Sequence, residues 1–382
     1  MEIYVHIPFC VRKCAYCSFV SFPSSRRTME AYVAALLKEA KGRACEIPEP
    51  VETLFIGGGT PSLLPSESFC ALIAGLKEIF HFEKLREFTV EANPGTLTEP
   101  FLEALCASGV TRVSLGMQSA QEDLLRRLGR IHTFAEVQAS VSLLRSFGIT
   151  NCNLDLMFGI PFQTLPDWQD TLSAALSLSP KHISAYGLIP EEGTPLFAYL
   201  SSGEWQLPPP EKEREMYDLA LETLSAHGFE QYEISNFALP GFACLHNIGY
   251  WDQIPYLGLG LSAASMRIIK HSAEGMECLR RTNPSNMKDY LEMVNTGDLS
   301  RAELETVSPA EARFETLMLA LRMTRGVSEE RFLALHGVSL DACFGEKLRS
   351  LESRGLLIHE KGAWRLSRRG MDIQNSILVE LM

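Results

Sequence analysis

The sequence lacks any apolar run close to the roughly 20 residues that a membrane-spanning helix needs. Its first ten residues, MEIYVHIPFC, lack the basic start, long apolar stretch and small-residue cleavage site of a secretory signal. Hydrophobic residues make up 46% and charged residues 21%, as in ordinary globular proteins. We therefore expect a cytoplasmic protein with at most peripheral membrane contact.

Positive charge is scarce as well. The chain has 35 Lys and Arg residues against 47 Asp and Glu residues, which gives a formal net charge of −12. Proteins that bind nucleic acid need a basic face to neutralise phosphate groups. The charge pattern therefore argues against a nucleic acid as the main partner.

Ten cysteines are present, but no second cluster of them. Cys10, Cys14 and Cys17 lie within the segment CVRKCAYC, and the next cysteine is Cys45. In a reducing compartment, such a cluster indicates a metal or redox site rather than a disulfide framework. We expect most of the isolated cysteines to be small buried hydrophobic residues. These are Cys45, Cys70, Cys106, Cys152, Cys244, Cys278 and Cys343.

The cysteine triplet also lacks a fourth ligand nearby. A structural zinc site is closed by four ligands, usually from two pairs. His6 could complete the set, but it lies in a predicted strand, so zinc is the weaker interpretation. Iron–sulfur clusters normally take four cysteines. Three cysteines would leave one iron of a cubane open to a small molecule, as in catalytic metal sites.

Six β-rich runs alternate with amphipathic helical stretches such as 28–42 and 134–148. The β-rich runs are 3–9, 51–59, 87–94, 112–119, 152–159 and 182–189. This alternation predicts a parallel sheet covered by helices, either doubly wound or a (β/α) barrel. In both folds, ligands gather at the carboxyl ends of the strands. The unusual residues fall at those ends, namely Cys10, Gly57 to Thr60, Glu91, Gln118 and Asp155.

The second half of the chain has a different pattern. The prolines at 207–210 interrupt the alternation, and an amphipathic helix is predicted over 211–227. A strand and a loop rich in aromatic residues and glycine follow at 232–265, and the composition becomes helical after about residue 270. The segment 355–370 predicts a short hairpin after helices, as in a winged-helix module. Because its charges are mixed, we interpret it as a lid or packing module rather than a DNA-binding one.

The spacing Cys-x₃-Cys-x₂-Cys, with Tyr16 just before the last cysteine, resembles the radical S-adenosylmethionine superfamily. The resemblance implies a [4Fe–4S] cluster whose open iron binds S-adenosylmethionine. The segment GGGTP at 57–61 matches a motif of this superfamily, and its glycines would offer free N–H groups to the ligand. Alternatively, it forms a tight strand-to-helix turn. The implied cofactor contacts are Tyr4, Tyr16, Gly58, Gly59, Thr60, Glu91, Gln118, Arg130 and Asp155.

Over nearly its whole length, the chain resembles the branch that contains oxygen-independent coproporphyrinogen III oxidase. That enzyme, an oxidative decarboxylase of haem synthesis, has a fourth cysteine where this chain has Phe19. It also has a longer N-terminal extension, whereas three residues precede Tyr4 here. The segments 4–19 and HNIGYW at 246–251 instead resemble the haem chaperones of the branch, in which H-N-x-x-Y-W is associated with haem.

The chaperone resemblance implies roles for the second motif. His246 would be an axial haem ligand, Asn247 would orient it, and Tyr250 and Trp251 would contact the macrocycle. Cys244 is an alternative ligand or attachment site. In a purely structural alternative, this stretch closes the barrel mouth, with Trp251 as a core plug and His246 bonded to backbone.

Together these observations predict an incomplete (β/α)₆ TIM-like barrel with a small helical, winged-helix-like C-terminal domain. We divide the chain into 1–205, 206–270 and 271–382. The resemblance implies transfer of haem to an acceptor such as a respiratory enzyme, with a flavodoxin or ferredoxin as electron donor if S-adenosylmethionine is cleaved. A simple zinc or redox module would predict the cysteines alone, without the residues at successive strand ends.

Overall fold

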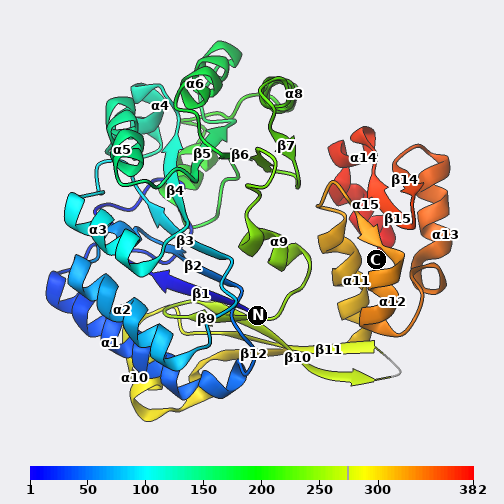
Figure 1. Ribbon diagram of the computed structural model, residues 1–382. Helices are drawn as coiled ribbons and strands as arrows, with labels where there is room; N and C mark the ends of the chain where they lie inside the picture. Colours follow the sequence, from blue (N-terminus) through cyan, green and yellow to red (C-terminus); the bar gives the residue numbers. More distant parts are fainter. Residues whose placement is uncertain (273–274) are drawn as a thin grey trace.

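The fold is built around one large sheet (Figure 1). The computed structural model describes residues 1–272 and 275–382. Six parallel strands lie side by side in chain order. They are β1 (Glu2–Ile7), β2 (Thr53–Gly58), β3 (Glu87–Ala92), β4 (Arg112–Gln118), β5 (Cys152–Phe158) and β6 (His182–Gly187). This order, without a reversal, belongs to a (β/α) barrel rather than a doubly wound sheet. All six predicted strands are confirmed.

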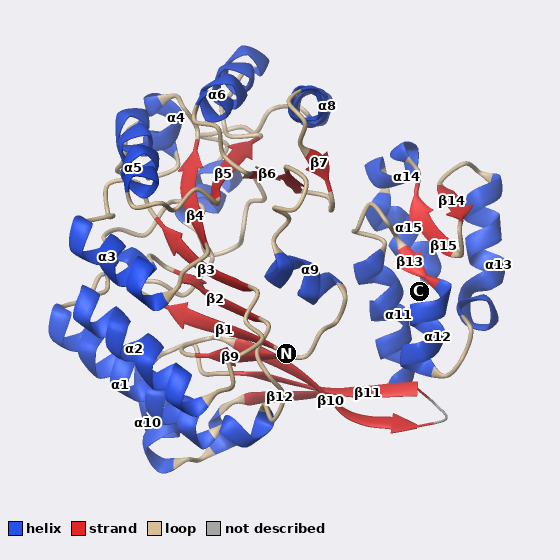
Figure 2. Ribbon diagram, in the orientation of Figure 1, coloured by secondary structure: helices blue, strands red, loops and turns tan. Residues whose placement is uncertain are grey.

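Helices follow the strands, and most of them cover the outer face of the sheet (Figure 2). They are α1 (Arg26–Gly42), α2 (Ser66–Ile79), α3 (Glu99–Ser108), α4 (Glu122–Arg127), α5 (Phe134–Ser146), α6 (Leu165–Ser177), α7 (Pro195–Ser201) and α8 (Pro210–Ala226). Side-chain caps fix where several begin. Ser25 accepts a hydrogen bond from the Thr28 N–H at the start of α1, and Thr133 and Glu136 form a capping box at α5. The sequences of the six parallel strands are mainly apolar because both faces of the sheet are buried.

The sheet continues beyond the six parallel strands. The added strands are β7 (Glu230–Gln231), β8 (Asn236–Ala238), β9 (Tyr256–Leu259), β10 (Ala264–Ser272), β11 (Gly275–Thr282) and β12 (Glu303–Val307). β9 pairs with β1 and β8 with β6, and β12 and β7 are the two edges of this twelve-stranded sheet. The helical composition expected after residue 270 therefore begins only at residue 287, and a boundary at 270 falls inside β10. The sequence signal that was missed is the alternation of polar and apolar side chains along β10, which forms a hairpin with β11. Ser265 and Arg267 lie on one face of β10, and Met266 lies on the other.

The C-terminal module has its own apolar core around Phe332, Leu348 and Trp364. Its elements are α11 (Pro309–Ala320), β13 (Val327–Ser328), α12 (Glu329–His336), α13 (Leu340–Ser353), β14 (Leu357–Glu360), β15 (Ala363–Leu366), α14 (Arg368–Asp372) and α15 (Gln374–Leu381). The predicted hairpin within 355–370 is present as β14 and β15. Helices α9 (Leu245–Trp251) and α10 (Met287–Thr296) precede this module.

The structure also bears on the expectations about membrane-spanning helices and about the burial of the isolated cysteines. Within 1–272 and 275–382, no helix is both long and apolar enough to cross a bilayer. Of the seven isolated cysteines, Cys152, Cys244 and Cys278 are buried, whereas Cys45, Cys70, Cys106 and Cys343 are exposed or half-buried. The expectation that most of them are buried is therefore wrong, because several lie on the outer faces of helices.

Candidate functional site

The cysteine triplet lies on a loop that follows β1 and is anchored at its base and its far end. At the base, the Cys10 N–H donates to the Phe22 carbonyl at 3.1 Å. At the far end, the Ala15 N–H donates to the Leu128 carbonyl, and the Ala15 carbonyl accepts from the Leu196 N–H, both at 2.9 Å. The loop is thereby closed on itself at Phe22 and tied to two helices, at the C-terminal end of α4 and in α7, so its side chains are held in place before any ligand binds.

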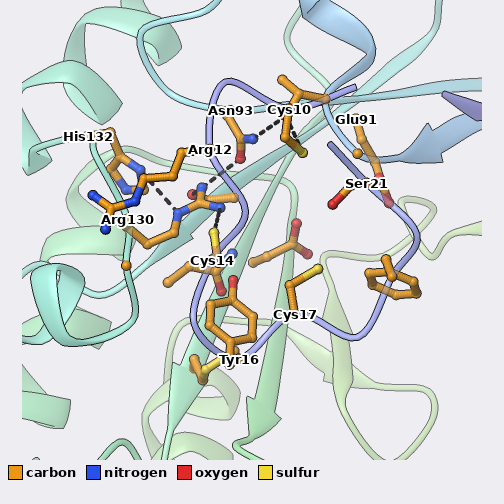
Figure 3. A pocket seen from close by; sticks show the side chains of 18 of the residues that line it. Cys10, Arg12, Cys14, Tyr16, Cys17, Ser21, Glu91, Asn93, Arg130 and His132 are labelled. Atoms are coloured by element: carbon orange, nitrogen blue, oxygen red, sulfur yellow. Dashed lines mark hydrogen bonds between the residues drawn. The ribbon is translucent and has the colours of Figure 1, made fainter. Parts of the chain in front are cut away.

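The three thiols line one cavity of about 560 Å³ at the carboxyl ends of the strands, which we call the thiol cavity (Figure 3). All three are free and half-buried. Among the described residues, no three Cys, His, Asp or Glu side chains converge closely enough to hold a single metal ion. Thiols spaced around a cavity suit a polynuclear cluster better than a mononuclear zinc site. The other predicted residues that line this cavity are Tyr16, Gly58, Gly59, Thr60, Glu91, Gln118, Arg130 and Asp155.

Two half-buried carboxyl groups face the same cavity from β3 and β5. Glu91 accepts a hydrogen bond from the Gly58 N–H at 2.9 Å. Burial and, to a smaller extent, the nearby charge of Asp155 raise the pKa of Glu91 to about 7. Asp155 accepts from Ser114 at 3.1 Å and Asn153 at 2.8 Å, and burial raises its pKa as well. These oxygens can accept hydrogen bonds from hydroxyl or ammonium groups of a ligand.

Arg130 connects the strand ends to the cysteine loop. Its Nη2 donates to Asn93 Oδ1 at 2.6 Å and to the Gly116 carbonyl at 2.7 Å, and its Nη1 lies 3.6 Å from the Cys14 sulfur. Its Nε donates to His132 Nδ1 at 3.3 Å. Sequence reasoning missed Asn93 and His132. A signal was available, because each lies two residues after a predicted site residue, Glu91 and Arg130 respectively.

The GGGTP segment forms the tight strand-to-helix turn given as the alternative interpretation. The N–H groups of Gly58, Gly59 and Thr60 are all used within the protein, so the expectation that they are free for a ligand is wrong. Their acceptors are Glu91 Oε2, the Ile7 carbonyl and the Phe9 carbonyl, respectively. Gly58 has a φ of +105°, and a Cβ at Gly59 would lie 2.8 Å from the Ile7 oxygen. The glycines therefore let the turn pack closely against β1.

Tyr4 is the one predicted cofactor contact that does not line the thiol cavity. Its hydroxyl is 3.0 Å from His6 Nδ1. Tyr4 lines two neighbouring cavities instead. One, of about 700 Å³, is bordered by β10 and β11, and we call it the hairpin cavity. The other, of about 170 Å³, lies inside the curve of the sheet, and we call it the lumen cavity.

His246 lies on α9, on the concave side of the sheet near the amino ends of its strands (Figure 1). Its Nδ1 is 2.7 Å from the hydroxyl of Thr53, the first residue of β2, and its Nε2 is 3.0 Å from the Tyr250 hydroxyl. Its ring stacks on Phe55 with a centroid distance of 5.2 Å. Burial, aided by the charge of Arg112, lowers its pKa to about 3. Neither ring nitrogen is free in this arrangement, which corrects the expectation of a ready iron ligand.

The neighbours of His246 also differ from expectation. Asn247 donates to the Tyr232 hydroxyl at 3.4 Å, so it does not orient the histidine. The Cys244 thiol donates to Glu87 at 3.3 Å, and burial raises its pKa to about 12, so it is no thiolate. The guanidinium of Arg322 lies 5.4 Å from the centre of the Trp251 ring.

This stretch therefore fits the structural alternative more closely, although side chains rather than backbone satisfy the histidine. His246 borders only the lumen cavity among the cavities described here, and about 170 Å³ is below the roughly 300–1,000 Å³ of ordinary small-molecule sites. A haem cannot enter that space without rearrangement of α9.

Several known proteins are similar to this chain in sequence or fold. The sequence model of the radical SAM superfamily matches residues 4–175, and that of the HemN C-terminal domain matches 307–373. The chain is 36% identical to heme chaperone HemW of Bacillus subtilis, over 98% of this chain and 97% of that protein. It is 31% identical to radical S-adenosyl methionine domain-containing protein 1, mitochondrial, of Danio rerio, over 100% and 86%.

A solved structure has the same fold. Coproporphyrinogen III oxidase (HemN) from Escherichia coli, described as a radical SAM enzyme, superposes with a TM-score of 0.83. The match covers 100% of this chain and 89% of that one, at 21% sequence identity.

Proposed function

The chain belongs to the HemW family of heme chaperones within the radical SAM superfamily, and from this premise we propose that it binds haem and delivers it to an acceptor protein. We also propose that Cys10, Cys14 and Cys17 hold a [4Fe–4S] cluster. One observation carries the cofactor proposal: the three thiols share a cavity with Glu91, Arg130 and other polar residues of successive strand ends.

The residues around the thiols fit the proposed cofactors. Bound together, a [4Fe–4S] cluster and S-adenosylmethionine supply one-electron chemistry. Glu91 and Asp155 would accept hydrogen bonds from the hydroxyl and ammonium groups of S-adenosylmethionine. Arg130 would hold the loop at Cys14 and place positive charge beside the anionic thiolates. Tyr16 and Gln118 complete the wall of the cavity.

The partners follow from this function. The haem acceptor would be a protein that uses haem, such as a respiratory enzyme, and a flavodoxin or ferredoxin would supply electrons if S-adenosylmethionine is cleaved. We place the protein in the cytoplasm, with membrane contact only through a partner. The remaining residues of the second motif, Asn247 and Trp251, would stabilise α9 rather than touch haem.

A second candidate is coproporphyrinogen III oxidase activity, favoured by the shared fold with HemN. The position of the fourth cysteine of that enzyme argues against it. Phe19 is 63% exposed there and borders both the thiol and hairpin cavities, so this wall is apolar where a thiol is expected.

Replacing Cys14 with Ser tests the cluster. We expect the anaerobically reconstituted variant to lose its iron and its brown absorbance, because a thiolate ligand is missing. Cys45→Ser is the matched control, since Cys45 is exposed and isolated, and it should keep both. Iron content and absorbance equal to those of the parent in Cys14→Ser would refute the ligand assignment.

A second assay separates the two functions. The reconstituted protein is titrated with haem in the Soret region, and a parallel sample receives coproporphyrinogen III, S-adenosylmethionine and a reductant. Stoichiometric haem binding without a divinyl product supports the chaperone. Formation of that product would establish the oxidase.

A further inference from the structure

The hairpin cavity, at about 700 Å³, lies outside the space assigned to the proposed cofactors. It lies between the first strand, the β10–β11 hairpin and helix α11, which packs against β11 (Figure 2). Its volume falls within the roughly 300–1,000 Å³ of small-molecule sites. Unlike the lumen cavity, it can take a large ligand.

The hairpin turns one chemically distinct face to this cavity. Because side chains alternate along a strand, Met266, Cys278 and Arg280 line the cavity, whereas Arg267 lies on the opposite face. Tyr256 lies beside them on β9. The wall therefore offers aromatic rings, soft sulfur atoms and one guanidinium group. These groups suit a flat apolar ligand that carries carboxylates and an iron ion.

The hairpin cavity also adjoins the thiol cavity. The two share Ser18, Phe19, Gly58 and Glu91 in their walls. A ligand in the hairpin cavity would thus lie next to the proposed cofactor site, separated from it by the cysteine loop and the GGGTP turn.

The HNIGYW stretch reaches this cavity through one residue. Tyr250 lines both the lumen cavity and the hairpin cavity. Its hydroxyl is bonded to His246 Nε2 at 3.0 Å, and its ring meets Tyr256 edge-on with a centroid distance of 4.7 Å. His246 therefore acts behind the wall, as the group that fixes the orientation of Tyr250.

Arg280 already binds a carboxylate in the cavity. Its Nη2 lies 2.6 Å from Glu315 Oε2 on α11, and its Nη1 lies 3.6 Å from Glu305. A propionate is the same chemical group as the Glu315 side chain. It can take the place of Glu315 on the guanidinium without leaving Arg280 unpaired.

We propose that haem binds in the hairpin cavity, with its macrocycle against Tyr250, Tyr256 and Met266 and with one propionate on Arg280 in place of Glu315. This inference rests on the proposed haem-carrying function and names its site. In it, His246 is a positioning residue rather than the iron ligand.

Substitutions of Arg280 and of Glu315 should change the affinity for haem in opposite directions, which tests the proposed site. Haem is titrated into the full-length, cluster-loaded protein, and the dissociation constant is read from the Soret band. Arg280→Gln should weaken binding about 10- to 100-fold, because a charge-assisted hydrogen bond is lost. Glu315→Gln breaks the same ion pair but removes the competing carboxylate, so binding should become tighter.

The opposite signs separate a site from a general loss of structure. If the ion pair only held the C-terminal module in place, both variants would weaken binding equally, and the proposal would be wrong. Arg267→Gln removes a positive charge from the outer face of the same hairpin and should leave the dissociation constant unchanged. Weakening by Arg267→Gln equal to that by Arg280→Gln would also overturn the site.

The histidine gives an independent readout. As a positioning residue, His246→Ala should weaken binding while the Soret maximum of the bound haem stays in place, and Tyr250→Phe should weaken binding similarly. A shifted maximum in His246→Ala would make His246 the iron ligand and refute the proposal. No haem binding by the parent protein would instead refute the proposed function. Parent binding that Arg280→Gln and Glu315→Gln leave unchanged would refute this site alone.

Discussion

The two motif-bearing regions of the molecule lie at opposite ends of the same strands and differ in almost every physical respect. At the carboxyl ends, Cys10, Cys14 and Cys17 are half-buried around a cavity of about 560 Å³. Near the amino ends, His246 is 2% exposed, stacked on Phe55 and bonded through both ring nitrogens. The first region is arranged to receive a ligand, whereas the second is arranged to hold its own side chains.

This difference bears on the proposed haem site, in which Tyr250 rather than the histidine of the same motif would contact the ligand. The three cysteines line the thiol cavity directly, with Thr60 3.5 Å from the Cys10 sulfur and Arg130 3.6 Å from the Cys14 sulfur. The histidine acts through the tyrosine one turn later, whose ring forms part of a larger cavity. Such indirect action is common where a binding group must be held in one orientation by groups behind it.

Replacing His246 with Ala should produce the largest effect on stability. It removes a buried stacked ring and leaves the Thr53 and Tyr250 hydroxyls without their partner, which should cost about 2–4 kcal/mol. Cys10→Ala, at the open end, should change the stability of the cluster-free protein by less than about 0.5 kcal/mol. Denaturant unfolding of both variants measures the contrast. Equal losses would show that the two regions are packed alike.

A smaller loss is expected when the space behind α9 is filled. A Cβ at Gly249 would collide with the Glu2 carboxylate, so Gly249→Ala should cost about 1–3 kcal/mol. The same change at Gly42, where a Cβ meets nothing within 4 Å, should be neutral or slightly stabilising because Ala favours a helix. Thermal unfolding of the pair checks this. A neutral Gly249→Ala would mean that α9 sits more loosely against β1.

The pH dependence of the free energy of unfolding should report on Glu2, which lies against α9. Burial raises the pKa of Glu2 to about 8, so the folded protein keeps a proton that the unfolded chain loses near its ordinary value. The stabilising contribution of the protonated Glu2 to the free energy of unfolding is therefore fully present at low pH. It is lost as the pH rises to about 8, by about 1.4 kcal/mol per pH unit. Glu2→Gln, which stays neutral, should have a flatter profile between pH 5 and 8 by about that slope. A difference between the two proteins that is constant over this range would contradict the raised pKa.

Much of this arrangement follows from local sequence, and the rest depends on distant partners. The six parallel strands were predictable because each is a short apolar run before a polar end. The thiol cavity was predictable because its three cysteines lie within eight residues. In contrast, His246 meets Thr53 across 193 residues, and its residue type is the same whether it binds iron or packs in a core. The hairpin cavity was missed for a related reason, since Tyr250, Met266 and Glu315 converge only in the fold.

The edges of the large sheet bear on how the protein behaves at high concentration. An exposed strand edge can pair with the same edge of another copy and start aggregation. Here β7 has only two residues, and β12 has five, with exposed Glu303 and Glu305 among them. Like charges on a short strand oppose edge-to-edge pairing between copies, and the net charge of −12 adds to that repulsion. The sheet therefore ends in strands that are poor templates for self-association.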